Sequence, residues 1–382
     1  MSKIVIVYNT PYPFMKGGGE KRLYEIARNF IRAGHQVTWI CEKAWKSDKK
    51  IISHNGIVYA SVGQLVRKSH SRRSVLPALF FALNLFRKPS LLKCDLIIVG
   101  QTPWVHFFPT LILKNIINRK TPIVLDIWEY WSNYWFQYYK FPVSLIGYLV
   151  EYCAIKLADY RVVISDLAES KIKEILKQGQ YTLIKNGFDQ SILDKKSGSR
   201  QKNKLVYFGR LEEHKNIKLL IDSVYDIQQT GVDVRLAIIG AGSEYYNLKK
   251  YVSYLKLESI ITIDGEAVSS DKAHNLMKRC DVFVQPSISE GGGSIAVLEA
   301  LACGLPVVLF KHPQGVDLSL IGYGAYGSVV NEVNRCSLSA GILQILQRTN
   351  TDMSIRENCI RFAKSQTWDK VTLEYLRFLS NR

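Results

Sequence analysis

Short apolar runs alternate with longer amphipathic stretches along the whole chain. In the first half, these runs predict strands at 3–8, 36–41, 96–100, 123–126 and 161–164. The second half repeats the pattern, and its runs predict strands at 205–208, 235–239, 260–263, 282–285 and 307–310. The stretches between them, such as 20–33 and 244–255, have helical spacing. Strands that alternate with helices are typical of an α/β protein with doubly wound parallel sheets.

One polar segment separates the two halves. Residues 194–204, DKKSGSRQKNK, contain glycine and serine and no large apolar side chain, as flexible linkers do. The chain of 382 residues is long enough for two well-formed cores. We therefore expect two domains, residues 1–190 and 204–365. Ligands of such sheets bind beyond the carboxyl ends of the strands, where the glycine loops of this chain are expected to lie.

The segment 280–308, CDVFVQPSISEGGGSIAVLEALACGLPVV, carries the most chemical information. A buried strand is followed by a loop with Glu290 and three glycines, and then by a helix with Glu299. A glycine-rich loop at a helix N-terminus presents free N–H groups and the positive end of the helix dipole, which together bind phosphate. The two carboxylates add acceptors for sugar hydroxyls, and Glu299 leans back toward the helix start. The combination predicts a sugar-nucleotide site.

This segment resembles the donor-site signature of the GT-B glycosyltransferases, in particular the retaining family 4. The matching residues are Ser287, Glu290, Gly291, Leu298, Glu299, Ala300, Ala302, Gly304, Pro306, Val307 and Val308. The family usually has seven residues between the two glutamates, whereas eight separate them here, which we interpret as a longer loop at 291–293. The sequence GRL at 209–211, followed by Lys215, is similar to the family's G-R-L-x-x-x-K signature. The segment around Trp368 resembles the family's C-terminal helix.

The resemblance implies two Rossmann-like, doubly wound domains that face each other across a cleft, with a C-terminal helix at 366–382 packed back on the first. It also implies a retaining transferase that moves a hexosyl group from a nucleotide-diphosphate sugar to a glycan or lipid-linked acceptor in cell-surface polysaccharide or glycoconjugate synthesis. Arg210 and Lys215 would stabilise the leaving diphosphate, and Glu290 would hold the transferred sugar. The other implied donor contacts are Gly18, Gly19, Gly265, Gly292, Gly293, Ser294 and, on the ribose, Glu299.

The acceptor side departs from the family pattern. The loop at 17–20 resembles the family's first glycine loop, which makes Glu20 an acceptor-side candidate. The family commonly has a His-Asp or Arg-Asp pair after the strand at 123–126, where this chain has Trp128 and Glu129. We take both as further candidates. Aromatic rings stack on sugars or contact lipid, and this segment contains Trp128, Tyr130, Trp131, Tyr134 and Trp135. Core packing explains any single one of these aromatic residues equally well.

We expect no metal and no other cofactor. No two aspartates stand two residues apart, so the D-x-D motif of the other glycosyltransferase architecture is missing, and the seven histidines lack metal-ligand spacing. A dinucleotide site is disfavoured because the G-x-G-x-x-G spacing is absent. Two alternatives remain open: a sugar-nucleotide epimerase of the same fold, and an inactive sugar-nucleotide-binding partner subunit. Trp128 and the extra loop residue favour the second of these.

The charge is unevenly spread. The net charge is +18, and residues 1–188 contain 27 Lys and Arg against 12 Asp and Glu. An acid-free stretch includes basic residues at 67–73 and 87–93 that flank an apolar run at 75–86. This pattern predicts an anionic partner. No nucleic-acid-binding signature accompanies it, so we expect an anionic membrane surface bound through 67–93, with a merely solvated basic face as the alternative.

Cysteine usage and the apolar runs bear on the compartment. The seven cysteines are scattered singly without a C-x-x-C, which is typical of a reducing environment. The N-terminus reads as a strand and not as a signal peptide, and no apolar run reaches the ~20 residues of a transmembrane helix. We expect a cytoplasmic protein, with the inner face of the cell membrane as a peripheral site.

Overall fold

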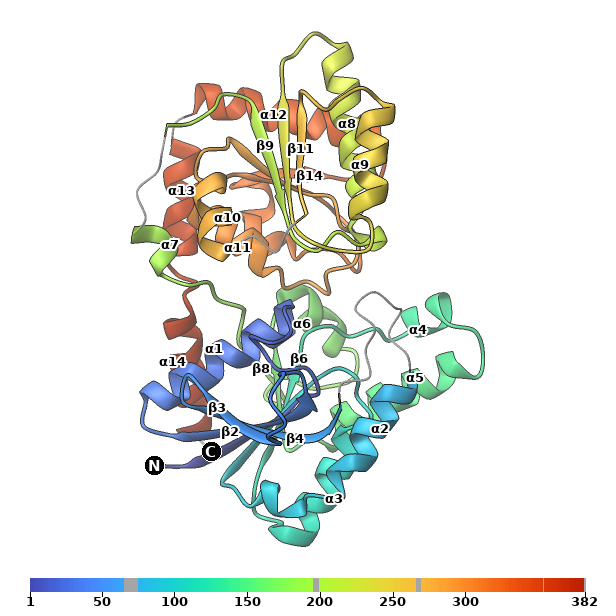
Figure 1. Cartoon of the computed structure of the whole chain (residues 1–382), viewed down its shortest axis with the longest axis vertical. Helices are drawn as coiled ribbons and strands as arrows, with labels where there is room; N and C mark the ends of the chain where they lie inside the picture. Colours follow the sequence, from blue (N-terminus) through green and yellow to red (C-terminus); the bar gives the residue numbers. More distant parts are fainter. Residues whose placement is uncertain (65–74, 195–198, 266–268, 353, 381–382) are drawn as a thin grey trace. The chain divides into compact units, whose positions relative to one another are not determined.

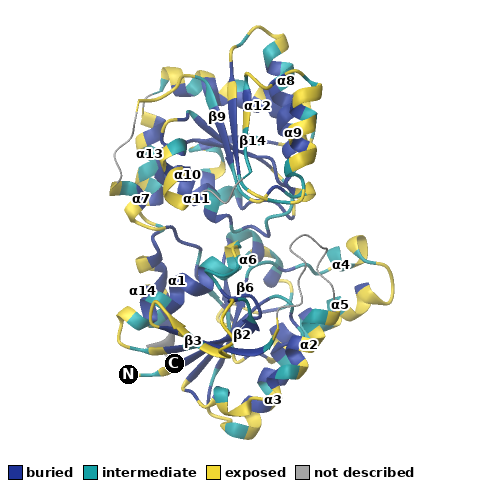
Figure 2. Ribbon diagram, viewed as in Figure 1, coloured by how far each residue is buried: buried dark blue, intermediate teal, exposed yellow. Residues whose placement is uncertain are grey.

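The computed structural model describes residues 1–64, 75–194, 199–265, 269–352 and 354–380. The chain divides into two compact units, Met1–Lys185 with Val371–Arg382, and Asn186–Lys370 (Figure 1). Each unit is built on a sheet whose strands are mostly buried, while the helices around it expose their outer faces (Figure 2). This is the doubly wound α/β arrangement that the sequence pattern predicts.

The first unit has an eight-stranded sheet in the order β3-β4-β2-β1-β5-β6-β7-β8. Its strands are β1 (Lys3–Val7), β2 (Gln36–Lys43), β3 (Ile51–His54), β4 (Ile57–Gln64), β5 (Leu96–Gly100), β6 (Ile123–Ile127), β7 (Tyr160–Val163) and β8 (Thr182–Leu183). Its helices are α1 (Gly18–Arg32), α2 (Val75–Leu85), α3 (Phe107–Ile117), α4 (Tyr134–Tyr138), α5 (Val143–Leu157), α6 (Asp166–Ile172) and most of α14 (Trp368–Ser380). All described pairings are parallel except that of β3 with β4.

The second unit has a six-stranded, all-parallel sheet in the order β11-β10-β9-β12-β13-β14. Its strands are β9 (Lys204–Phe208), β10 (Arg235–Ile239), β11 (Ile261–Asp264), β12 (Val282–Gln285), β13 (Val307–Phe310) and β14 (Gly327–Val330). Its helices are α7 (Ser191–Asp194), α8 (Ile217–Gln229), α9 (Tyr245–Tyr254), α10 (Ser270–Met277), α11 (Ile295–Ala302), α12 (Arg335–Thr351) and α13 (Ser354–Ala363).

Successive side chains along each strand of the second sheet point to opposite faces, and each face is covered by its own set of helices. Leu205 and Tyr207 of β9 belong to a core cluster with side chains of α8, α9 and α12. Val206, between them, belongs to the opposite cluster with side chains of α10, α11 and α13. Because both faces are covered, the strands are continuously apolar, and this is why the sequence pattern located them.

The hairpin of β3 and β4 was not predicted from the sequence. Asn55 and Gly56 at its turn have φ values of 50° and 80°, as a tight two-residue hairpin turn requires. The Asn-Gly dipeptide was the available signal. The strands β8 (TL) and β14 (GSVV) were missed as well, because neither contains an apolar run.

The boundary between the units also differs from the expected linker. Phe188 and Ile192 are buried in the core of the second unit, and the Phe188 amide donates to the Gln366 carbonyl oxygen at 3.1 Å. The second unit therefore begins at Asn186, before the polar segment 194–204, of which residues 195–198 lie outside the described part. Apolar anchors, which a composition window overlooks, set the boundary.

The end of the chain returns to the first unit. From Val371 onward α14 belongs to that unit. Tyr375 packs edge to face on Phe30 of α1, with ring centroids 6.1 Å apart. The Asn29 side-chain amide donates to the Thr372 hydroxyl at 2.9 Å. The last helix is thus fixed to α1 by a buried aromatic pair and a buried hydrogen bond.

Candidate nucleotide-sugar site

The turns that follow β9 and β10 each contain a glycine, Gly209 and Gly240, and they pack closely against each other. A Cβ atom on Gly240 would lie 1.8 Å from the Gly209 carbonyl oxygen, so only glycine permits this approach of the two turns. The Tyr207 hydroxyl donates to the Arg210 carbonyl oxygen at 2.9 Å. Arg210 is therefore fixed through its backbone at the carboxyl end of β9, while its side chain is exposed.

A buried ion pair joins Lys215 to Glu290. Lys215 ends the short helix η2 (Glu213–Lys215), and Glu290 lies in the loop between β12 and α11. The Lys215 Nζ is 2.6 Å from the Glu290 Oε1, and only 9% and 12% of the two side chains is exposed. The strands β9 and β12 that precede them are neighbours in the sheet. The structure thus brings together two residues that lie 75 positions apart in the sequence.

Gln285 is a candidate that the sequence analysis missed. It is the last residue of β12 and is 3% exposed. Its Nε2 donates to the Glu290 Oε1 at 2.7 Å, and this orientation is required because a carboxylate only accepts hydrogen bonds. Gln285 is therefore a positioning residue for Glu290. A polar side chain at the end of an otherwise apolar strand was the signal in the sequence.

The electrostatics of this cluster favour an anionic ligand. Burial alone raises the pKa of Glu290, but the Lys215 ammonium and the hydrogen bonds that Glu290 accepts outweigh burial and hold its pKa below the ordinary value. Partial desolvation, with Lys215 and Arg210 nearby, lowers the pKa of His214 to about 4, although part of the His214 surface is exposed. Near pH 7 the Glu290 carboxylate is ionised and His214 is neutral. The exposed Arg210 guanidinium adds positive charge at the same strand end.

The extra residue of the glycine loop is accommodated by a second loop. The amides of Glu290 and Gly291 donate to the Gln314 carbonyl oxygen at 2.8 and 3.1 Å, and the Gly292 amide donates to the Gly315 carbonyl oxygen at 2.9 Å. Gly291 and Gly292 have φ values of 63° and 95°, which favour glycine. These amides are already bonded, so the expected phosphate cradle does not include all of the loop.

The start of α11 supplies the remaining donors. Ser294 is the N-cap, and its Oγ accepts from the Val297 amide at 3.4 Å. The amides of residues 293–296 have no backbone acceptor among the described residues. Together with the helix dipole they form an anion-binding position, one that retains Gly293 and Ser294 of the expected contacts.

Glu299 is buried in α11 and faces a histidine. Its side chain is 3% exposed, and its Oε2 lies 3.5 Å from the Nε2 of His274 on α10. The His274 ring meets Phe208, the last residue of β9, edge to face with centroids 6.5 Å apart. Glu299 is therefore held near the end of the same strand that positions Arg210. His274 was not predicted from the sequence, because nothing in its spacing indicates a partner on α11.

Gly265 directly follows β11. A Cβ atom there would lie 2.0 Å from the Tyr245 ring, which therefore covers this glycine. Residues 266–268 lie outside the described part of the chain. Packing against Tyr245 accounts for glycine at this position, and a contact with the nucleotide stays a prediction.

The acceptor-side candidates gather at the carboxyl edge of the first sheet. A Cβ atom on Gly19 would lie 2.2 Å from the Trp128 ring, so the ring lies directly over this glycine. Trp128 meets Tyr8 edge to face, with ring centroids 5.2 Å apart. The Glu20 Oε1 accepts from the Tyr8 hydroxyl at 3.3 Å. Gly18, the first residue of α1, faces open space.

A buried ion pair supports this cluster. The Arg22 Nε lies 2.8 Å from the Asp126 Oδ2, and the two side chains are 1% and 0% exposed. Arg22 also donates to the carbonyl oxygens of Ile184 and Lys185, both at 3.0 Å. The Trp128 indole N–H donates to Asp126 at 3.3 Å. Asp126 thereby links the helix α1 to the ring that covers Gly19.

Gln101 fixes the backbone of the two residues that replace the family's pair. Its Oε1 accepts from the amides of both Trp128 and Glu129, the latter at 2.8 Å. Neither Gln101 nor the role of Asp126 was predicted from the sequence, because such pairings across a sheet leave no periodic signal.

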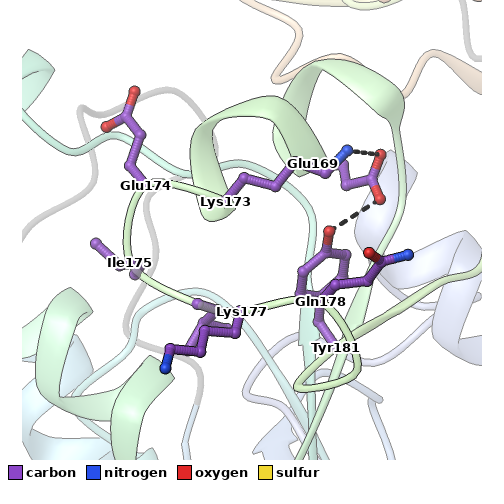
Figure 3. A pocket seen from close by; sticks show the side chains of 8 residues that line it. Glu169, Lys173, Glu174, Ile175, Lys177, Gln178 and Tyr181 are labelled. Atoms are coloured by element: carbon purple, nitrogen blue, oxygen red, sulfur yellow. Dashed lines mark hydrogen bonds and ion pairs between the residues drawn. The ribbon is translucent and has the colours of Figure 1, made fainter.

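A cavity of about 600 Å³ lies elsewhere in the first unit (Figure 3). Its lining residues are Glu169, Lys173, Glu174, Ile175, Leu176, Lys177, Gln178 and Tyr181. Glu169 accepts from Lys173 at 3.0 Å and from the Tyr181 hydroxyl at 3.1 Å. Because these groups satisfy one another and none is a predicted site residue, we assign the cavity no ligand.

Two Rossmann-like parallel-sheet units define the class of the GT-B glycosyltransferases. The family model for glycosyl transferases group 1 matches residues 189–365, and that for glycosyltransferase family 4 matches residues 16–191. The chain belongs to this GT-B family 4, or group 1, of glycosyltransferases, as the donor-site signature implied.

Curated relatives cover part of the chain. An uncharacterized glycosyltransferase of Methanocaldococcus jannaschii is 26% identical over 216 residues, which are 56% of this chain and 58% of that protein. The O-antigen biosynthesis glycosyltransferase WclY of Escherichia coli is 30% identical over 219 residues, 54% of this chain and 58% of that protein. The chain thus spans a little over half the length of these relatives.

The similar solved structures match the whole length of this chain. Sucrose-phosphate synthase from Thermosynechococcus elongatus has a TM-score of 0.80 at 16% identity and covers 100% of this chain and 99% of its own. HepE of Anabaena, solved in complex with UDP, has a TM-score of 0.75 at 19% identity, with 100% of both chains covered. At such identities the likeness shows the fold.

Proposed function

We propose that the protein is a retaining, metal-independent hexosyltransferase that uses a nucleotide-diphosphate sugar. The observation that carries this proposal is the buried cluster in which Lys215 and Gln285 hold Glu290, a residue of the loop that leads to the α11 N-terminus. A cation, an ionised carboxylate and unpaired helix amides suit a ligand that combines a diphosphate with a polyhydroxylated ring. The solved complexes of HepE with UDP and with UDP-glucose support the donor class.

Each group has a distinct task in the proposed reaction. Arg210, Lys215 and the amides of 293–296 stabilise the charge that develops on the leaving diphosphate. Glu290 binds hydroxyls of the transferred sugar, and Glu299 binds the ribose. The acceptor hydroxyl attacks the anomeric carbon from the face that the diphosphate leaves, and a phosphate oxygen of the leaving group takes its proton. Catalysis then rests on positioning and on preorganised charge.

The first unit would bind the acceptor. Glu20, Trp128 and Glu129 lie at the carboxyl edge of its sheet, where ligands of such sheets bind. The relatives' names include an O-antigen and a putative colanic acid biosynthesis glycosyltransferase. A glycan or lipid-linked acceptor in the synthesis of cell-surface polysaccharides or glycoconjugates fits these relatives.

We also place the protein in the cytoplasm, at the inner face of the membrane. The described part of segment 67–93 includes α2, whose exposed apolar residues are Leu76, Leu79, Phe80 and Leu83. The exposed cations Arg87 and Lys88 follow this helix. Residues 65–74, with the basic residues Arg67, Lys68, Arg72 and Arg73, lie outside the described part. An apolar helix next to cations is the composition that anionic membranes attract.

A donor panel tests the proposal. UDP-, GDP- and ADP-sugars are added separately to the purified protein, and thermal unfolding is followed. The correct donor, at 100 times its Kd, is expected to raise the free energy of unfolding by about 2.7 kcal/mol. Product analysis with and without acceptor then separates a transferase from an epimerase, and hydrolysis of the donor argues against an inactive partner subunit. Stabilisation by none of the sugar nucleotides would contradict the proposal.

Chelation tests the metal independence. The described residues contain no group of three or more His, Cys, Asp or Glu side chains able to hold a metal ion. Activity is therefore expected to survive excess EDTA, because Arg210 and Lys215 supply the positive charge on the diphosphate. Initial rates before and after chelation are the measurement. Complete loss of activity, restored by Mg²⁺ or Mn²⁺, would refute this mechanism.

A further inference from the structure

The hairpin formed by α4 and α5, residues 131–157, exposes an unusual amount of apolar surface. Its large, solvent-exposed apolar side chains are Phe136, Tyr138, Phe141, Val143, Leu145, Ile146, Leu149 and Leu157, with exposed fractions of 38–78%. Figure 2 shows the hairpin mainly in the colours of exposed and intermediate residues. Leu145, Ile146 and Leu149 have the spacing of one helix face, so α5 presents an apolar stripe to solvent. Exposed apolar surface of this extent marks an interaction site.

The hairpin is held in one conformation by buried contacts. The Trp135 ring lies on Gly147, where a Cβ atom would be 2.3 Å away. Glu151 is fully buried and accepts from the backbone amides of Trp131 and Ser132, both at 3.0 Å, and from the Trp135 indole N–H at 2.9 Å. The exposed stripe is therefore a preformed surface, and binding through it requires little ordering.

The exposed charged residues of the hairpin are all positive. Its only charged residues are Lys140, Glu151 and Lys156. The two lysines are exposed, whereas Glu151 is buried beneath the aromatic residues that it binds. The surrounding aromatic side chains include Trp131, Tyr134 and Tyr139, which pack on one another. Tryptophan and tyrosine beside apolar side chains and lysine form the composition found at the boundary between lipid headgroups and acyl chains.

We propose that the α4–α5 hairpin inserts its apolar stripe into the interfacial layer of an anionic lipid bilayer. Among the described residues, no helix combines the length and the apolar composition that crossing a bilayer requires, so the hairpin lies in the surface of the membrane. A second copy of this chain is a poorer occupant, because a self-complementary interface offers no acidic group to meet Lys140 and Lys156. This surface is separate in sequence from segment 67–93.

The connection to the acceptor side follows from the chain path. Strand β6 ends at Ile127, Trp128 and Glu129 follow, and the hairpin begins two residues later. Insertion of the hairpin would therefore place the acceptor-side candidates close to the bilayer surface, where the polar head of a lipid-linked acceptor lies. This last step rests on the proposed function, whereas the docking itself does not.

Vesicle co-sedimentation of the full chain tests the docking. Phe141→Ser, Ile146→Ser and Leu149→Ser are combined in one variant, whose three positions are 78%, 57% and 47% exposed. The matched control combines Tyr246→Ser, Tyr254→Ser and Tyr323→Ser, which are 74%, 79% and 72% exposed in the second unit. Vesicles of phosphatidylcholine with and without phosphatidylglycerol are compared at low salt. Unfolding midpoints of both variants are measured to show that they fold.

The hairpin variant is expected to lose binding to anionic vesicles by at least about 10²-fold, because three apolar side chains no longer enter the bilayer. The tyrosine control is expected to bind like wild type, and Lys140→Ser to bind anionic vesicles about fivefold more weakly. Wild-type affinity of the hairpin variant, or no binding by wild type, would overturn the proposal. A change from dimer to monomer in the hairpin variant without a change in vesicle binding would assign the stripe to self-association instead. Donor-induced stabilisation, measured without vesicles, should be unchanged, so failure of docking and failure of the donor assignment are distinguishable.

Discussion

Replacing Arg210 or Lys215 with alanine is expected to lower kcat by about 10²–10³-fold, the range seen when one preorganised donor to developing charge is lost. Lys218→Ala is the control, since this exposed cation lies over the Tyr251 ring, 4.5 Å from its centroid. Steady-state kinetics with the identified donor are the measurement. Wild-type turnover in both variants would remove Arg210 and Lys215 from the site.

The two variants are expected to differ in stability. Arg210 is exposed, so its loss should leave the unfolding midpoint nearly unchanged, whereas Lys215→Ala leaves the buried Glu290 carboxylate without its cation. The lowered pKa of Glu290 contributes stability that is present above the pKa of the unfolded chain, about 4.3, and is lost as pH falls through the folded value. In Lys215→Ala burial raises the pKa of Glu290 toward or above that of the unfolded chain, so this acid-side loss should shrink or disappear, and the variant should be destabilised chiefly near neutral pH. Unfolding midpoints across the acidic range report it.

Asp126→Ala is expected to lower the free energy of unfolding by about 3–5 kcal/mol, because it leaves the Arg22 guanidinium charged in a site that is 1% exposed. The measurement is the free energy of unfolding of the first unit, obtained from its transition in urea. Lys173→Ala is the control: the Lys173 side chain is 56% exposed in its ion pair with Glu169, so its loss should leave the free energy of unfolding nearly unchanged.

A second variant separates the charge from the volume of this pair. Arg22→Met combined with Asp126→Leu removes both charges, and it is expected to recover much of the lost stability. The Trp128 indole then loses its acceptor, so the double variant should still weaken acceptor binding. If the Asp126→Ala protein is as stable as wild type, the prediction is wrong. The carbonyl oxygens of Ile184 and Lys185 would then stabilise the buried Arg22 guanidinium without Asp126.

The sequence predicted the main strands because each is a continuous apolar run between polar or glycine-rich turns. It did not reveal that Phe188 anchors the start of the second unit, since one aromatic residue in a polar stretch has no periodicity. Within the site, motif spacing located Lys215 and Glu290 separately. Their contact, and the part that Gln285 plays in it, depend on the neighbouring positions of β9 and β12, which no local pattern encodes.

The acceptor side was less predictable for a related reason. The sequence showed that Trp128 stands where the family has His or Arg. Its position over Gly19, however, depends on contacts with Asp126, Gln101 and Tyr8 together. Each of these is an ordinary strand or loop residue when read alone. Their joint effect arises only when three parallel strands end at the same edge of the sheet.

The hydrogen bonds between the glycine loop and residues 314–317 restrict how the length of either loop can change. Gly292 and Val316 form a bridge, and the Asp317 amide returns a hydrogen bond to the Gly292 carbonyl oxygen at 2.8 Å. A deletion that restored the usual spacing of the two glutamates would therefore shift one side of this bridge by a residue. Keeping the bridge would then require a matching change in the length of the loop at 311–317.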